Sequence, residues 1–197
     1  MEPVFVPGEP ALFLTAREKE WKALVAQHCP VRLTRPRLGF TVASFRRRGH
    51  VFDLDNLTKP VLDVVGGAVE SVWATVAEGQ VPGVSIGEGT PPPPPRVDFR
   101  VSIADPPRRS VRTDQPLPEL ADVVPVGVNE HLGMRLALHG AQKIGDFGFE
   151  GPVKPLIDAL APVLGGRPGR PADHRIKDLR VVQGAADDGA DVVLWVL

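Results

Sequence analysis

The sequence predicts an α+β fold, a mixed sheet with packed helices, made of two related α/β modules in one chain of 197 residues. Short apolar stretches that alternate with polar residues recur along the chain, as in half-buried strands. The segment LGFTVA at 38–43 returns as LGMRLA at 132–137, and KPVLD at 59–63 returns as KPLID at 154–158. A strand and the helix after it recur in the same order, which favours an internal duplication over chance similarity.

The N-terminal part predicts a strand, a helix and a second strand. Residues 4–8, VFVPG, are typical of a short strand followed by a turn. The amphipathic stretch 14–28 predicts a helix, with Thr15 as its N-cap and Glu18 completing a capping box. Residues 37–45, RLGFTVASF, predict the second strand because their apolar residues alternate.

A second helix is expected to start near Thr58 or Lys59, because Pro60 is tolerated only in the first turn of a helix. The apolar residues after Pro60 predict a buried face. The Gly-Gly pair at 66–67 ends this helix.

The rest of the chain continues the pattern of strands and helices. Residues 84–103 predict two strands joined by a loop whose five prolines cannot pair inside a sheet. A strand at 131–140 and a helix at 153–164 follow. Residues 175–197 predict a closing hairpin, so that each module would end in a hairpin-like pair of strands.

The repeat divides the chain into a module with an acid cluster at 1–105, a Pro/Arg-rich linker at 106–118 and a second, degenerate module at 119–197. The second module is degenerate because the positions aligned with Asp53, Asp55 and Asn56 hold Gly148, Glu150 and Gly151. The alternative is a single module with an insertion at about residues 80–147.

Composition and charge exclude several classes of protein. Hydrophobic residues make up 43% and charged residues 24% of the chain, which is ordinary for a globular protein. The single cysteine, Cys29, excludes an internal disulfide framework and a Cys-rich zinc site. Without a signal-peptide pattern or an apolar run long enough to span a membrane, we expect a cytoplasmic protein with no membrane partner.

The net charge of −1 gives no overall reason to expect a nucleic-acid partner, but basic residues gather locally. Arg46, Arg47 and Arg48 are consecutive and precede the acid cluster. Such a local positive field attracts phosphates even in a nearly neutral chain. The alternative is a solvated edge of the sheet.

Asp53 and Asp55 stand two positions apart, so both side chains would project from the same face of an extended segment. Clustered carboxylates are hard oxygen ligands that suit Mg²⁺, and also Mn²⁺. Lys59 could then stabilise a phosphate or a leaving group. The alternative is that Asp55 or Asn56 caps the helix and Lys59 pairs with Asp63, which leaves Asp53 unexplained.

The stretch DLDNLTKPVLDVV resembles the signature of the RusA-type Holliday-junction resolvases, in which Asp-x-Asp-Asn, a following Lys and a helix carrying Asp recur. The preceding FRRRGHVF and the opening FVPG turn and helix are also similar to that family. The later segment ADHRIKDLRVV resembles the part of the family that carries a third catalytic Asp. The resemblance implies a small α/β dimer that cleaves branched DNA with Mg²⁺.

The resemblance also implies roles for individual residues. Asp53, Asp55 and Asp173 would be the metal ligands, and Lys59 the catalytic cation. The residues implied on the DNA are Arg46, Arg47, Arg48 and Asn56.

The third ligand has two candidates, because Asp173 lies far from Asp55 in the sequence and Ala172 replaces an acid of the family. Asp173 completes the site if the chain is one module, or if two modules exchange segments. If the modules are separate, Asp173 belongs to the second one and Glu70 takes its place. Asp173 is preferred and Glu70 is the reserve.

We therefore expect a Mg²⁺-dependent endodeoxyribonuclease that resolves branched DNA such as Holliday junctions, as a monomeric pseudo-dimer or a homodimer. The alternative is a non-catalytic DNA-binding or interaction protein on the same fold. A general nuclease for flaps or single strands is a further possibility.

Overall fold

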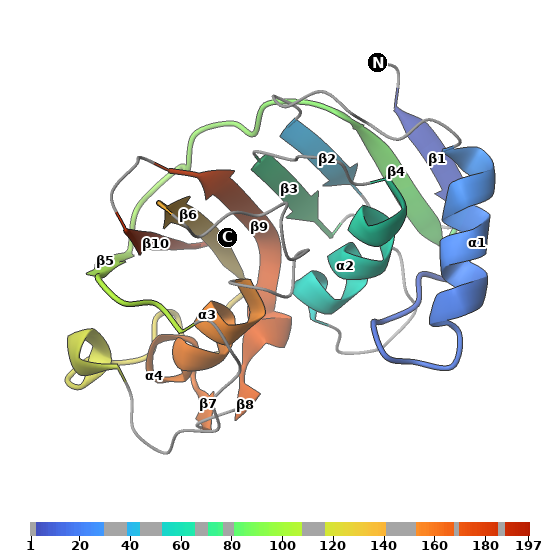
Figure 1. The fold of residues 1–197 in the computed structure, drawn as a ribbon. Helices are drawn as coiled ribbons and strands as arrows, with labels where there is room; N and C mark the ends of the chain where they lie inside the picture. The colour runs from blue at the N-terminus through green and yellow to red at the C-terminus, as the bar shows by residue number, and fades with distance from the viewer. Residues whose placement is uncertain are drawn as a thin grey trace.

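A mixed sheet of eight strands runs through the whole molecule (Figure 1). The computed structural model describes residues 3–29, 39–43, 53–65, 71–76, 81–107, 117–140, 153–167, 170–184 and 188–197, with backbone alone for 39–43. Across the sheet the strands follow the order β1-β4-β2-β3-β9-β6-β10-β5. This architecture confirms the predicted α+β class with a mixed sheet.

The N-terminal half contributes β1 (Val4–Pro7), α1 (Glu18–His28), β2 (Gly39–Ala43), α2 (Leu54–Val65), β3 (Ser71–Thr75) and β4 (Gly83–Glu88). The C-terminal half begins with β5 (Phe99–Ile103), the 3-10 turn η1 (Pro118–Leu120), β6 (Leu132–His139), α3 (Val153–Ala159) and α4 (Ala161–Leu164). It ends with β7 (Gly166–Arg167), β8 (Arg170–Pro171), the 3-10 turn η2 (Asp173–Arg175), β9 (Ile176–Gln183) and β10 (Gly189–Val196).

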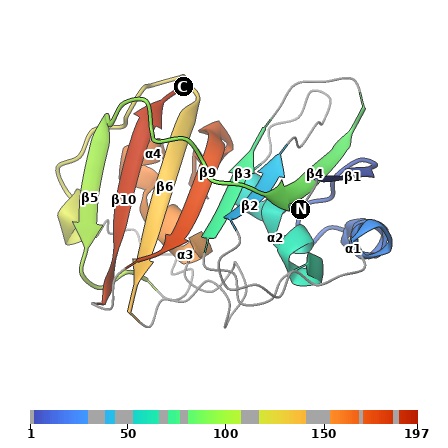
Figure 2. The same ribbon diagram turned by 90° about the horizontal axis from the view of Figure 1, so that it is seen from above.

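The two halves of the sheet share one strand order and one set of strand directions. From one edge to the middle the order is β1-β4-β2-β3, and from the other edge it is β5-β10-β6-β9 (Figure 2). In each half the first two pairings are antiparallel and the third is parallel. β3 and β9 then pair antiparallel in the middle of the sheet.

The strand registers also agree between the halves. Gly39 of β2 lies opposite Ser71 of β3, and the matching Gly133 of β6 lies opposite Asp178 of β9. By this match Trp73 corresponds to Arg180, two positions further along each strand. Trp73 and Arg180 are also opposite each other in the β3–β9 pair, so two corresponding residues meet at the middle of the sheet.

The line where β3 meets β9 is held by a buried polar stack. Trp73 Nε1 donates a hydrogen bond of 3.0 Å to Asp178, and the guanidinium of Arg180 pairs with the same carboxylate at 2.6 Å. Arg180 also lies 4.6 Å from the ring centroid of Trp195 and 5.8 Å from that of Trp73. A cation between two aromatic faces adds attraction to the strand pairing itself.

One apolar core joins helices from both halves to the sheet. The buried residues of α2 pack in the same cluster as those of β3, β9 and α3. Representative members are Leu57, Val61, Val72, Leu156 and Leu179, which are each 0–1% exposed.

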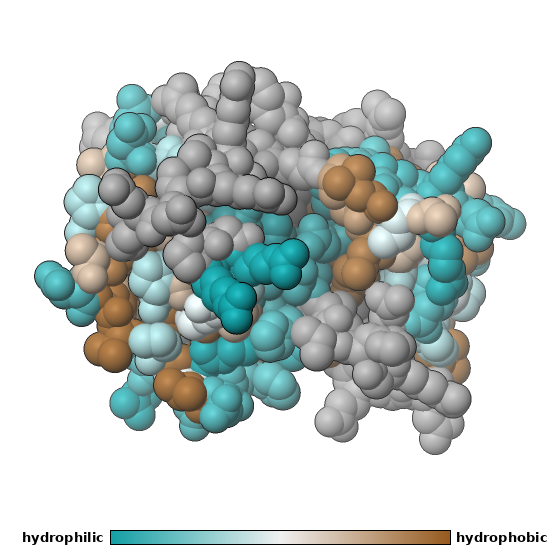
Figure 3. Space-filling view, turned by 90° about the horizontal axis from the view of Figure 1, so that it is seen from below, coloured by the Kyte–Doolittle hydropathy of each residue, from teal (hydrophilic) through white to brown (hydrophobic). Residues whose placement is uncertain are grey.

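In the view from below, hydrophobic residues at the surface form separate areas among hydrophilic ones (Figure 3).

Both predicted hairpins are wrong, because in neither case do the two strands pair with each other. β4 pairs with β1 and β2, whereas β5 pairs with β10 at the opposite edge. β9 and β10 are separated by β6, which pairs with both. A pattern of two apolar strands cannot reveal that a third strand lies between them. The predicted linker at 106–118 falls largely outside the described residues.

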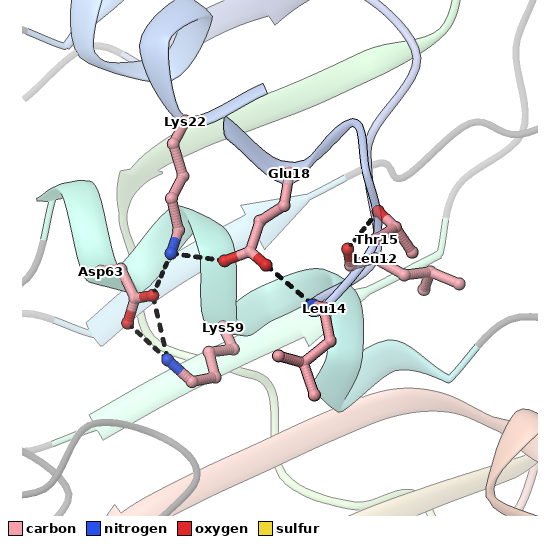
Figure 4. Close-up of polar contacts among 7 residues, drawn as sticks. All are labelled: Leu12, Leu14, Thr15, Glu18, Lys22, Lys59 and Asp63. Atoms are coloured by element: carbon pink, nitrogen blue, oxygen red, sulfur yellow. Dashed lines mark hydrogen bonds and ion pairs between the residues drawn. The ribbon is translucent and has the colours of Figure 1, made fainter. Parts of the chain in front are cut away.

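The first helix also begins later than predicted. α1 starts at Glu18, and Arg17 occupies the N-cap position without a side-chain hydrogen bond. The hydroxyl of Thr15 donates to the carbonyl of Leu12 instead, while Glu18 accepts a hydrogen bond of 2.7 Å from the amide of Leu14. The predicted capping box is therefore replaced by a turn before the helix (Figure 4).

Candidate functional site

Asp53 and Asp55 lie at the start of α2 rather than on a strand, which corrects the predicted extended geometry. The helix begins at Leu54, and the amide of Leu57 donates to the carbonyl of Asp53. Asn56 Nδ2 donates a hydrogen bond of 3.1 Å to the Asp53 carboxylate. Asn56 thus orients Asp53 within the protein, and a contact of Asn56 with DNA stays a prediction.

Pro60 sits inside α2, four residues after Asn56, and the predicted start near Thr58 or Lys59 is therefore too late. A proline has no amide hydrogen to donate to the carbonyl one turn earlier, which normally destabilises a helix. Here the carbonyl of Asn56 accepts a hydrogen bond of 3.0 Å from the amide of Phe13. The segment before α1 thus supplies the missing donor, and the acids stay in the first turn of α2.

Asp173 belongs to the turn η2, directly before β9, and is 7% exposed. The turn is fixed by Arg175, whose guanidinium donates to four backbone carbonyls of two other segments, α4 and the loop before β6. These carbonyls belong to Leu164, Glu130, Val126 and Gly127. Multiple hydrogen bonds from one buried cation restrict the turn, so Asp173 has a defined position.

Lys154, the lysine of the recurrent Lys-Pro pair in the C-terminal half, joins these acids. Its Nζ lies 2.8 Å from Asp173 Oδ2, 3.3 Å from Asp55 Oδ2 and 3.4 Å from Asp158 Oδ1. Asp55 is 4% exposed, so two buried carboxylates from different halves of the chain share one amine. The sequence signal for Lys154 was the repeat KPLID, but its role could not be read from the repeat alone.

Burial and, after it, repulsion among the acids shift the pKa values in this cluster. Burial raises the pKa of Asp55 to about 6, and Asp173 and Asp53 add to the increase while Lys154 opposes it. Burial also raises the pKa of Asp173, against Lys154 and with a contribution from Asp53. The pKa of Lys154 is raised because Asp55 and Asp173 outweigh its burial. The three acids Asp53, Asp55 and Asp173 therefore come together, as the preferred prediction requires.

Lys59 points to a different set of partners. Its Nζ lies 2.9 Å from both carboxylate oxygens of Asp63 and 4.4 Å from the ring centroid of Phe13. Lys22 of α1 joins Asp63 at 2.6 Å and Glu18 at 2.5 Å (Figure 4). The Lys59–Asp63 pair that was the structural alternative is present, and a catalytic role of Lys59 stays a prediction.

Two further sets of predicted residues fall outside the described part of the chain. These are the reserve ligand Glu70 and the predicted DNA contacts Arg46, Arg47 and Arg48.

A second lysine, Lys177 of β9, lies close to the acids. Burial lowers the pKa of Lys177, and the attraction of Asp53 opposes this change.

The carboxylate oxygens of this cluster are of the type that Mg²⁺ prefers, although the amine of Lys154 lies close to two of the carboxylates. Among the described residues, no three acids, histidines or cysteines are grouped as ready metal ligands. The pKa values of Asp55 and Asp173 are raised first by burial and then by repulsion from neighbouring acids, and Lys154 does not fully offset the two. Hard oxygen ligands with excess negative charge are what Mg²⁺ prefers.

No protein-family model, no curated protein and no solved structure matches this chain. Among the helices of the described segments, none has the length and apolar character needed to cross a membrane.

Proposed function

We propose that the chain is a Mg²⁺-dependent, structure-selective endodeoxyribonuclease that acts on branched DNA such as Holliday junctions. The observation that supports this most is that Lys154 joins Asp55 and Asp173, while Asp53 lies within hydrogen-bond reach of Asp173. Asp173 is 118 positions after Asp55 in the sequence, and the resemblance to RusA-type resolvases singled out both.

The residues of the cluster have separate tasks in phosphodiester hydrolysis. Mg²⁺ or Mn²⁺, when bound, would acidify water and neutralise charge on a phosphate oxygen. Asp53, Asp55 and Asp173 would hold the cation, and Asn56 would keep Asp53 oriented through its hydrogen bond. We assign the amine that stabilises the developing phosphate charge to Lys154, because its Nζ already lies beside Asp55 and Asp173.

The matching strand orders and registers support a fused pseudo-dimer. Corresponding residues Trp73 and Arg180 are opposite each other, as they would be at a two-fold axis between two modules. Asp53 and Asp55 come from the start of α2 in the N-terminal half, while Lys154 and Asp173 come from the C-terminal half. The proposed site is thus shared between the halves, which is the exchange considered for Asp173.

The second candidate is a non-catalytic DNA-binding protein on the same fold. The ion pairs of Lys154 with Asp55 and Asp173 favour this reading, because such pairs also occur as purely structural contacts. The pKa values of Asp55 and Asp173, raised first by burial and then by neighbouring acids, argue against a purely structural role, since a stabilising network would lower them.

Cleavage assays on defined DNA test the proposal. Purified protein is incubated with a four-way junction, a flap and a linear duplex, with and without Mg²⁺. Wild type is expected to cut the branched substrates only with Mg²⁺, and Asp55→Asn should reduce the rate by at least about 100-fold. Asp63→Asn, the same change two turns further along α2, is the matched control and should retain cleavage.

The outcomes separate the candidates. Equal cleavage by wild type and Asp55→Asn would contradict the proposed site. Binding of junctions without any cleavage would favour the DNA-binding protein, and preference for the flap would favour the general nuclease.

A further inference from the structure

The proposed site has no equal counterpart in the other half of the chain. The separation of 95 residues between the two Lys-Pro pairs places Gly148 and Glu150 at the positions of Asp53 and Asp55. Glycine has no side-chain oxygen, and the carboxylate of glutamate is one methylene further from the backbone. The two halves therefore differ in the residue types that the proposed chemistry needs.

The position of Asp173 is not repeated either. Asp178 corresponds to Ser71 by the sheet registers, and Asp173 precedes Asp178 by the five residues that separate Gly66 from Ser71. The only acid in residues 66–70 is Glu70. The N-terminal half thus offers glycine where the C-terminal half has a buried aspartate.

The two corresponding lysines are also neutralised differently. Lys154 Nζ lies 3.3 Å from Asp55 Oδ2 and 2.8 Å from Asp173 Oδ2, and both carboxylates are buried. Lys59 Nζ meets Asp63, whose pKa is lowered because hydrogen bonds from Lys22 and Lys59 outweigh its burial. The Lys59 cluster is a balanced surface ion-pair network, whereas the Lys154 cluster has excess negative charge.

We propose that one chain makes a single incision in each branched DNA it binds, so that its product is a nicked molecule. This rests on the proposed nuclease function. A four-way junction has two-fold symmetry, and its resolution into two duplexes needs two cuts, hence two sites. In each incision one water is consumed: its oxygen bonds to phosphorus, one P–O ester bond breaks, and the departing sugar oxygen takes up a proton.

The topology of a cut plasmid distinguishes one incision from two. The substrate is a supercoiled plasmid with an inverted repeat extruded as a cruciform, in excess over wild-type protein and with Mg²⁺. A single nick releases the supercoiling, and the cruciform is then reabsorbed, so a later second cut loses its substrate. Open circles are expected to exceed linear molecules by at least about tenfold from the earliest time points.

Each outcome bears on the inference. Linear plasmid as the main early product, in step with the loss of supercoiled plasmid, overturns the single incision and leaves the nuclease function standing. No product from the cruciform plasmid overturns both. Open circles that also form on a plasmid without the inverted repeat contradict the branched substrate while supporting the single incision. Lys154→Met should abolish the open circles, because both halves contribute to one site.

Discussion

The two Lys-Pro helix starts carry the same motif and lie in opposite electrostatic surroundings. Around Lys59, two acids and two amines are balanced, and the pKa values of Glu18 and Asp63 are lowered despite their burial. Around Lys154, several acids compete for one amine, and the pKa values of Asp55 and Asp173 are raised. In the first cluster folding favours the charged acids, whereas in the second it disfavours the charged forms of Asp55 and Asp173 while it favours the charged form of Lys154. Buried acids whose pKa values are raised in this way are candidates for function.

The largest expected difference is in catalysis. Lys154→Met should lower the rate of junction cleavage by about 10²–10³-fold, as expected when one donor to a developing charge is removed. Lys59→Met should lower it much less. The measurement is the single-turnover rate on a four-way junction for both variants. A larger loss for Lys59→Met would move the catalytic amine back to the position implied by the family resemblance.

The next largest effect concerns stability. The raised pKa of Asp55 means that its contribution to stability is full below pH ~4 and is lost as the pH rises through about 6. At pH 8 the charged form is disfavoured in the folded protein. Asp55→Asn should therefore raise the free energy of unfolding by about 1–3 kcal/mol without metal. Urea unfolding of wild type and Asp55→Asn at pH 8 and pH 5 measures this difference. A variant less stable than wild type at pH 8 would contradict the prediction.

Divalent cations should act on the same cluster. Millimolar Mg²⁺ is expected to raise the melting temperature of wild type at pH 7.5 by a few degrees, because a ligand that binds only the folded state stabilises it. The increase should shrink below pH ~6, where Asp55 becomes protonated and loses affinity for the cation. Thermal unfolding with Mg²⁺ or with equal ionic strength of NaCl measures it. An equal increase in Asp55→Asn would show that the cation binds elsewhere.

The smallest effect is expected for the balanced cluster. The lowered pKa of Asp63 contributes stability above its unfolded value of pH ~4, and this contribution is lost as the pH falls. Asp63→Asn should therefore destabilise the protein by about 0.5–1 kcal/mol at pH 7, since its pairs with Lys22 and Lys59 are partly exposed. Urea unfolding at pH 7 and pH 3 compares wild type with Asp63→Asn. A variant more stable than wild type at pH 7 would remove the contrast between the clusters.

Local patterns predicted much of the secondary structure but little of the strand pairing. The strands at 4–7, 39–43 and 132–139 and the helix at 153–164 fall within predicted stretches, although the helix divides into α3 and α4. The strand at 83–88 begins one residue before its predicted stretch. The partners of β5 and β10 depend on contacts between residues far apart in the sequence. Pro60 was misjudged for the same reason, because the amide of Phe13 that compensates for it lies on another segment.

The candidate site shows the same division between local and distant information. Short motifs were enough to name Asp53, Asp55 and Asp173. The sequence left open whether these acids meet, because this depends on whether the chain is one module, two separate modules or two modules that exchange segments. Lys154 could be found only once the sheet order had brought α3 and α2 to the same core. The repeat identified the lysine, while the fold decided which acids it would meet.

The cation–aromatic stack around Arg180 gives the protein a built-in optical reporter. The chain has three tryptophans, and the Arg180 guanidinium lies 5.8 Å from the ring centroid of Trp73 across the β3–β9 line and 4.6 Å from that of Trp195 in β10. Trp21 lies in α1, away from that line. Emission from a Trp21→Phe variant would therefore record the separation of the two halves during unfolding, without any added dye.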